Sequence, residues 1–241
     1  MKTGIVVLGR DSCNESENRT VMRCCEYLRE HGHRNVFPAF HFGGPRSDDV
    51  VREMFLRDGI DTFSILPLAA AEGNMTIWHM PKQIGLPDNS GSWAMIGEHD
   101  IAVRFATALG RSARMAEAIM SEIGEPYEGC AALILYKSSE LSIARKVADY
   151  YTEAVRSIGW TAECCGCPGS AGSLEETVRR LRDEGCYKLT VIPLFVSAGG
   201  RQYEDAVREL DGTGAEYVLS PPLSEYREFY EILESKVPEG W

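Results

Sequence analysis

Short apolar runs alternate with amphipathic stretches along the first part of the chain. Residues 4–9 are apolar and bounded by glycine, which is typical of a buried parallel strand. Residues 35–42 and 62–68 form similar runs. Asn14 or Ser16 is expected to cap the helix that follows the first run, and Ser47 the helix that follows the second. The order strand, helix, strand, helix, strand predicts a parallel sheet with right-handed crossovers.

The second half of the chain repeats this order. Its predicted strands cover residues 130–136, 161–165, 187–196 and 216–219, and its predicted helices cover residues 140–158, 174–184, 201–210 and 225–237. Between the halves, residues 81–108 are less regular and carry a loop signal, whereas residues 112–123 are expected to form the helix that leads into the second half.

The two halves also share a short stretch of sequence. In each, a helix end and a glycine are followed by an apolar run that closes on Pro-Leu. Gly59 lies as far before Pro67 as Gly185 lies before Pro193. This spacing is an internal repeat, and it indicates two similar halves.

The repeat predicts an α/β fold with two similar domains, residues 1–124 and 125–241. Each would be a small parallel sheet flanked by helices, and a pseudo-twofold axis would relate the two. The 241 residues of the chain suffice for two domains of roughly 100–150 residues each. A cleft between such domains is a natural ligand site.

Composition narrows the class of partner. The net charge of −11 argues against sequence-independent nucleic-acid binding, which needs a basic footprint, and an acidic membrane surface would repel the chain. No apolar run approaches the roughly 20 residues that span a bilayer. Nucleic acid and membrane are therefore not expected partners.

The N-terminus moves directly into a short strand and lacks the apolar core and cleavage site of a signal peptide. A cytoplasmic location with reduced thiols is therefore expected. The eight cysteines are expected to be core residues or metal ligands rather than disulfides.

In open parallel sheets, ligands bind beyond the carboxyl ends of the strands. Six loops occupy such ends in the predicted fold, and the chemistry is expected there. The loops contain Gly9-Arg10-Asp11-Ser12 and Tyr136-Lys137-Ser138-Ser139, His41-Phe42-Gly43-Gly44-Pro45 and Cys164-Cys165-Gly166-Cys167-Pro168, and Glu72-Gly73-Asn74-Met75 and Ala198-Gly199-Gly200-Arg201.

Two of these segments carry a family resemblance: the run from Ile192 to Arg201, and Gly73-Asn74-Met75 leading to Met80-Pro81. With the order of the other loops, they resemble the class II chelatases that insert cobalt, nickel or iron into sirohydrochlorin, the CbiX-type cobaltochelatases and their relatives. The resemblance covers nearly the full chain. It implies a chelatase-like fold and a lyase that metallates a tetrapyrrole.

The chain departs from the family where metal should be handled. In the family, each half places a histidine after the first strand, a glutamate after the second and a histidine after the third. The corresponding residues here are Arg10, His41 and Met75 in the first half, and Lys137, Cys164 or Cys165, and Arg201 in the second.

Chelation needs a base that holds a divalent cation and takes the two pyrrole protons, which histidine can do near neutral pH. His41 is therefore the first expected catalytic residue. Arginine cannot act as a base, and a lysine can do so only where burial strongly lowers its pKa. On that condition Lys137 is the second expected catalytic residue.

The cationic loop residues suit anion binding, and sirohydrochlorin carries many carboxylates. The residues expected to bind substrate are Arg10, Ser12, Ser139, Gly199, Gly200 and Arg201. The alternative is that the charged ones are surface residues paired with Asp or Glu, because charged groups usually lie in water.

His41, Met75 and His79 could form a relocated site for a soft or borderline metal, since Met75 and His79 would share a helix face. The alternatives are core packing for Met75 and an interface position beside Trp78 for His79.

Cys164 and Cys165 are further metal candidates. Cys164 and Cys167 form a Cys-x-x-Cys pair that could hold zinc or part of an iron–sulfur cluster. The alternative is that these cysteines are small apolar residues in a tight turn.

The leading hypothesis is a divergent chelatase that inserts cobalt, nickel or iron into a sirohydrochlorin-type tetrapyrrole in cobalamin or siroheme synthesis. Tetrapyrrole and metal ion are its substrates, no cofactor is required, and a homodimer is left open. The second hypothesis is a non-catalytic tetrapyrrole- or anion-binding protein with the same fold. A third, a periplasmic-type ligand binder, conflicts with the missing signal peptide.

Overall fold

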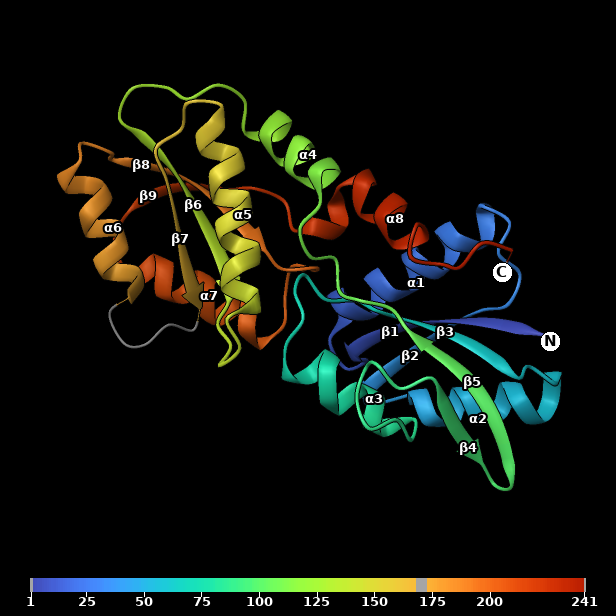
Figure 1. Cartoon of the computed structure of the whole chain (residues 1–241). Helices are drawn as coiled ribbons and strands as arrows, with labels where there is room; N and C mark the ends of the chain where they lie inside the picture. The colour runs from blue at the N-terminus through green and yellow to red at the C-terminus, as the bar shows by residue number, and fades with distance from the viewer. Residues whose placement is uncertain (1, 168–172, 241) are drawn as a thin grey trace. The chain divides into compact units, whose positions relative to one another are not determined.

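The computed structural model describes residues 2–167 and 173–240, and within them the chain forms two compact α/β units (Figure 1). The first unit combines Met1–Leu109 with Tyr230–Trp241, and the second is Gly110–Phe229. Among the described residues, no helix is both long and apolar enough to cross a bilayer.

The sheet of the first unit has five strands in the order β2-β1-β3-β5-β4. All pair in parallel except β4, which is antiparallel to β5. The strands are β1 (Thr3–Asp11), β2 (Val36–Phe42), β3 (Thr62–Pro67), β4 (Trp93–Ile96) and β5 (His99–Phe105). The helices are α1 (Glu15–Glu30), α2 (Ser47–Asp58), the π-helical η1 (Met75–His79) and α3 (Met80–Gln83).

The sheet of the second unit has four parallel strands in the order β7-β6-β8-β9. The strands are β6 (Cys130–Lys137), β7 (Ala162–Cys167), β8 (Lys188–Leu194) and β9 (Glu216–Leu219). The helices are α4 (Ala113–Ile123), α5 (Ile143–Ser157), α6 (Ser173–Asp183), α7 (Arg201–Gly212) and the 3₁₀ turn η2 (Leu223–Glu225). Helix α8 (Arg227–Glu234) begins in this unit and continues into the first. The predicted α/β fold with two similar parallel-sheet domains is confirmed.

One pair of strands was not predicted. The stretch expected to be irregular contains the β4–β5 hairpin, in which Ile96 pairs with His99 across a tight turn. Gly97 in that turn has a φ of 64°, which a glycine adopts at little cost. Strand β4 has only four residues, whereas β5 buries alternate residues, Ile101, Val103 and Phe105, and the loop signal before β4 outweighed that pattern.

Helices cover both faces of each sheet (Figure 1). In the first unit α1 packs on one face of β1 and β2, while α2 and α3 close a core on the other. In the second unit α5 packs on one face of β6 and β7, while α6 and α7 close a core on the other. Seven of the eight cysteines are buried, and Cys13 is exposed.

The units divide the chain at a different place from the predicted boundary at residues 124 and 125. Helix α4 belongs to the second unit because it packs on α5. The C-terminal segment returns to the first unit, where Tyr230 lies 5.3 Å from the ring of Tyr27 and Lys236 Nζ donates to Thr107 Oγ1 at 3.2 Å.

Strand register relates the two sheets residue by residue. Leu8 pairs with Ala39 on one side and Pro67 on the other. Leu135 pairs in the same way with Cys165 and Pro193. With the two prolines superposed, Ala39 corresponds to Cys165. Two residues farther along the second strands, His41 therefore corresponds to Cys167.

The first helices of the units match as well. The buried positions Val21, Cys24, Cys25 and Leu28 of α1 recur at the same spacing in α5 as Ala148, Tyr151, Thr152 and Val155. By this correspondence Glu17, in the first turn of α1, takes the position of the buried Ala144.

Candidate functional site

The carboxyl ends of β1, β2 and β3 lie at one edge of the first sheet, because the three strands are parallel. Strand β1 ends there with Arg10 and Asp11, and Asn14 caps α1 by accepting a hydrogen bond from Glu17 N at 2.9 Å. This cap fulfils the expectation for Asn14. It aims the first turn of α1 at the loop that follows β1.

Ser12 joins the β1–α1 loop to the β2–α2 loop. Its hydroxyl accepts a hydrogen bond from Gly44 N at 2.9 Å. A Cβ at Gly43, which has a φ of 74°, would lie only 2.0 Å from Ser12 Oγ. Ser12, predicted to bind substrate, thus has a contact in the structure that holds the two loops together.

His41 lies near the end of β2, on the face that carries α2 and α3. Its Nδ1 is 3.0 Å from Gln83 Oε1, and its backbone oxygen accepts from Gln83 Nε2 at 3.2 Å. The ring also makes an edge-on contact with Phe42, with centroids 4.5 Å apart. Two contacts therefore orient the half-buried imidazole, and a third holds its backbone.

The surroundings of His41 favour its neutral form. Burial lowers the pKa of His41 first, and the positive charges of His79, Arg46 and Arg10 lower it further, whereas the hydrogen bond to Gln83 opposes them. Arg10 and His79 thus lie near enough to His41 for their charges to act on its ring. Three predicted site residues are thus brought together at this edge of the first sheet.

The segment with Met75 and His79 forms a π-helix that runs on into α3. Met75 is partly buried and packs against the hydrophobic core, whereas the His79 side chain is exposed. These contacts agree with the alternative interpretation of Met75, which is core packing. Among the described residues, no group of three or more His, Cys, Asp or Glu side chains is arranged to hold a metal ion.

Glu17, Ser47 and Gln83 were missed as site residues. Glu17 accepts a hydrogen bond from Arg10 N, and burial raises the pKa of this carboxyl although the backbone and charge of Arg10 lower it. Ser47 was predicted to cap α2, but it is a buried first-turn residue whose hydroxyl donates to Gln83 Oε1 at 2.9 Å. The only sequence signal for Glu17 is an acidic residue early in a helix, which is commonplace.

In the second unit the predicted residues at the end of β6 are exposed. Lys137 and Ser139 both face solvent, and Ser139 Oγ accepts from Leu141 N at 3.2 Å. The burial on which a base role for Lys137 depends is not present.

The loop after β8 carries two glycines and an exposed arginine. Gly199 and Gly200 have φ values of 93° and 83°, and Gly200 is the N-cap of α7. The side chain of Arg201 is 92% exposed and lies 3.6 Å from Asp205. This contact agrees with the alternative interpretation of Arg201, a surface residue paired with an acidic side chain.

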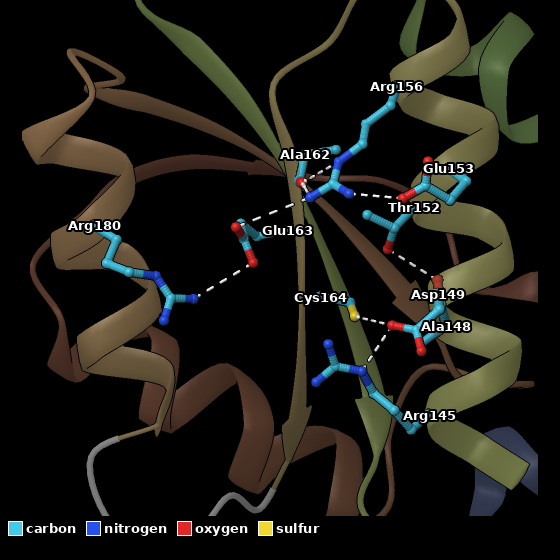
Figure 2. A network of polar contacts seen from close by, with 10 residues as sticks. All are labelled: Arg145, Ala148, Asp149, Thr152, Glu153, Arg156, Ala162, Glu163, Cys164 and Arg180. Carbon is cyan, nitrogen blue, oxygen red and sulfur yellow. Dashed lines mark hydrogen bonds and ion pairs between the residues drawn. The ribbon is translucent and has the colours of Figure 1, made fainter. Parts of the chain in front are cut away.

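Cys164 lies within a polar network on the edge strand β7 (Figure 2). Its Sγ is 3.4 Å from Asp149 Oδ1, and Asp149 also pairs with Arg145 at 2.7 Å. Burial raises the pKa of Cys164 to about 11, so the thiol is neutral at physiological pH. A neutral buried thiol is a poor metal ligand.

The rest of that network secures the sheet edge (Figure 2). Arg156 donates to the outward-facing Ala162 oxygen at 2.6 and 2.9 Å, while Glu163 accepts from Arg180 at 3.4 Å. Covering an edge carbonyl in this way protects a strand against unwanted pairing. The network is therefore structural.

The structure corrects the expectation that Cys164 and Cys167 share a zinc ion or an iron–sulfur cluster. Strand β7 extends through Cys167, so residues three apart face opposite sides of the sheet. Cys165 and Cys167 lie in the core beneath α6 and α7, whereas Cys164 faces α5. Pro168 of the predicted loop lies outside the described residues.

Comparisons with known proteins agree with this fold. The profile of the CbiX family matches residues 4–125 and 138–240. The cobalt complex of the sirohydrochlorin chelatase SirB from Bacillus subtilis subspecies spizizenii is 15% identical with a TM-score of 0.73, over 98% of this chain and 94% of that one. No curated protein matches the sequence.

Two further solved structures share the architecture. A CbiX described as the terminal enzyme of siroheme biosynthesis in denitrifying bacteria is 15% identical with a TM-score of 0.60, over 98% of this chain and 97% of that one. A multi-domain protein of Deinococcus radiodurans with structural similarity to chelatases is 19% identical with a TM-score of 0.72. All of this chain is covered there but only 55% of that protein, so this chain spans about half its length.

The family profile extends through both units, and the solved chelatases reproduce the two parallel sheets and their flanking helices. The chain therefore belongs to the CbiX family.

Proposed function

We propose that this protein is a metal chelatase, a lyase that inserts a divalent cation into a sirohydrochlorin-type tetrapyrrole in cobalamin or siroheme synthesis. Cobalt is the first expected metal, with nickel and iron as alternatives. Membership of the CbiX family supports the class of reaction. The observation that carries the proposal is the oriented, half-exposed His41 at the carboxyl edge of the first sheet.

Metal insertion exchanges two protons for one divalent ion. Two pyrrole N–H bonds break, the freed nitrogen lone pairs bind the metal, and two protons leave. A neutral imidazole can hold the incoming cation or accept one of these protons, and water takes the other. His41 has the surroundings that favour this neutral state.

Cations near the same edges would hold the substrate. Arg10 lies close to His41 in the first unit, and Lys137 and Arg201 are exposed at loops of the second. Arginine matches the planar geometry of a carboxylate and stays charged, so these residues suit a polycarboxylate macrocycle. His79, which also lies near His41, is the second proposed contact for the metal.

The test is an absorbance assay of sirohydrochlorin with Co²⁺ and purified protein. Removing His41 as His41→Ala is expected to slow insertion about 10²–10⁴-fold, the usual contribution of a general base. His99→Ala is the matched control, because His99 begins β5 and so lies at the opposite, amino edge of the same sheet. Equal rates for the wild type and His41→Ala would refute the proposal.

A second candidate function is binding without turnover. It is favoured by Arg10, Lys137, Met75 and Arg201, which stand where the resemblance places four histidines. Titration of the protein with metal-free sirohydrochlorin separates the two functions. Tight binding with no metal insertion at any tested metal would support the second.

A further inference from the structure

Gln83 and Ser47 form a chain of hydrogen bonds that ends on the His41 ring. Gln83, at the end of α3, contacts both the ring and the backbone oxygen of His41. Ser47, the first residue of α2, donates its hydroxyl to Gln83 Oε1 at 2.9 Å. The end of β2 and the start of α2, which are neighbours in the sequence, thus meet the distant helix α3 at one imidazole.

Packing holds Gln83 in place. Met80 and Ile84, one helical turn apart, are both buried in the core of the first unit. Gln83 lies between them along the helix and is partly buried at the margin of that core. Ser47 itself is fully buried, so its hydroxyl needs an internal partner, which is Gln83.

The backbone of His41 decides which way the Gln83 amide points. A carbonyl oxygen can only accept, so the amide group facing it must be the NH₂. Reversing the amide would set two oxygens against each other and would leave Gln83 Oε1 away from the Ser47 hydroxyl. The orientation therefore follows from the partners on both sides of the amide.

Gln83 Oε1 is an acceptor only, which determines the ring nitrogen that faces it. Nδ1 of His41, 3.0 Å away, must carry the proton and donate it. In a neutral imidazole the other nitrogen then holds the lone pair. Nε2 is therefore the basic atom of the ring.

We propose that Gln83 and Ser47 are positioning residues that keep His41 in its Nδ1–H tautomer, with the Nε2 lone pair free for a divalent metal or a pyrrole proton. The proposal rests on the proposed chelatase function for its purpose, but the tautomer itself does not depend on any substrate. Partners of this kind behind a ligating histidine contribute about 10–100-fold to affinity or activity.

The second unit supports the assignment by contrast. His41 corresponds in strand register to Cys167, and Gln83 and Glu209 lie equally far along the sequence from Pro67 and Pro193. The charge of Glu209 acts on Cys167, much as Gln83 contacts His41, and a serine begins both α2 and α6. The histidine and the amide thus occur together in one unit and are both replaced in the other. If Gln83 acts by holding His41, the two residues are expected to be replaced together, as they are in the second unit.

The tautomer is measured directly by long-range proton–nitrogen correlation of protein labelled with nitrogen-15 histidine, at mildly alkaline pH and without ligands. The chain has five histidines, and His41→Gln assigns the signal. The wild type is expected to show a protonated Nδ1 and an unprotonated Nε2. A protonated Nε2 in the wild type would overturn the proposal.

Variants then test the role of Gln83. Gln83→Leu is expected to shift His41 toward the other tautomer and to lower kcat about 10–100-fold with little change in KM for the tetrapyrrole. Gln83→Glu keeps an acceptor toward Nδ1 and should retain the Nδ1–H tautomer, although it loses the donor to the His41 carbonyl oxygen and is expected to be less stable. Lys82→Leu, an exposed neighbour on the same helix, is the control. An unchanged tautomer in Gln83→Leu would overturn the proposal.

Ser47→Ala provides a variant that keeps Gln83 itself. Without the hydroxyl, Gln83 is held less firmly, and an effect in the same direction but smaller than that of Gln83→Leu is expected. If the tautomer responds as described but the wild type inserts no metal, the positioning role stands and the chelatase function fails. If metal is inserted but the tautomer is unaffected by Gln83→Leu and Ser47→Ala, the positioning role fails alone.

Discussion

The two units have the same sheet and different chemistry at its carboxyl edge. In the first, His41 is half-exposed and hydrogen-bonded to Gln83. In the second, the matching Cys167 is 0% exposed and lies in the core beside Cys165. The same backbone position therefore holds a basic ring in one unit and an inert thiol in the other.

The electrostatics of the two positions differ in kind. Cys165 and burial raise the pKa of Cys167, and the charge of Glu209 raises it further. The corresponding Gln83 is neutral and instead accepts from the His41 ring. A duplicated scaffold can thus keep its strand order while only one copy retains a group that exchanges protons near neutral pH.

The largest expected difference is between matched substitutions at the two positions. His41→Gln is expected to slow metal insertion about 10²–10⁴-fold, because an amide cannot accept the proton. Cys167→Ala should leave the rate near that of the wild type, since its thiol is buried and neutral. Initial rates with sirohydrochlorin and Co²⁺ measure both. A comparable loss in the two variants would contradict the asymmetry.

The next prediction tests whether the position of Cys167 could accept a histidine, the residue at the matching position of the first unit. Cys167→His places a larger polar ring in a filled core and is expected to lower the free energy of unfolding by about 1–3 kcal/mol. Cys13→His, at the exposed cysteine, should change it by less than about 0.5 kcal/mol. Urea denaturation of both variants gives the values. Equal stabilities would mean that Cys167 is not confined by packing.

A smaller difference in the free energy of unfolding is expected between variants of Met75 and Arg201, the residues that follow the third strand of each unit. Met75→Ala is expected to cost about 1–2 kcal/mol, less than the roughly 2–5 kcal/mol of a fully buried methionine, since Met75 is only partly buried. Arg201→Ala should cost less than about 0.5 kcal/mol because the side chain is 92% exposed. Thermal or urea unfolding tests this pair. A larger loss for Arg201→Ala would reverse the assignment.

The smallest expected effect concerns Glu17, which corresponds to Ala144 in the second unit. Burial raises the pKa of Glu17 above its ordinary value of 4.5, so the folded state binds the proton more tightly than the unfolded state. The stability that Glu17 contributes is full below that ordinary value and is lost as the pH rises through the folded pKa.

The free energy of unfolding of the wild type, relative to Glu17→Gln, should therefore increase as the pH falls from neutrality toward 4.5. Denaturant titrations of both proteins across this range measure the difference. A difference that decreases with falling pH would contradict the assigned direction.

Much of the fold could be predicted because it depends on local pattern. The apolar runs, the helices between them and the Pro-Leu repeat gave the parallel sheets, and the cap at Asn14 followed from residue type. The β4–β5 hairpin was missed because β4 has only four residues and the loop signal before it outweighed the alternating pattern of β5. The C-terminal segment that returns to the first unit escaped because its partners, such as Tyr27, are distant in sequence.

The candidate site could be predicted only in part. His41 was identified from its place at a strand end and from the family resemblance, and His79 from its spacing of four residues beyond Met75. The structure brings His79 near enough for its charge to act on His41. The paired cysteines were misjudged, since a loop was expected where β7 continues, and strand geometry sends Cys164 and Cys167 to opposite faces. Gln83 was missed because an amide on a short helix carries no sequence signal.

The sequence by itself determined the order of elements, the likeness of the halves and the chemistry available at each loop. These depend on the periodicity and identity of neighbouring residues, which a linear chain displays. Only the tertiary structure decided which residues share a face, that Ser47 and Gln83 meet behind His41, and that Cys167 is its buried counterpart. Strand register and helix packing fix those contacts, and both depend on residues brought together only when the chain folds.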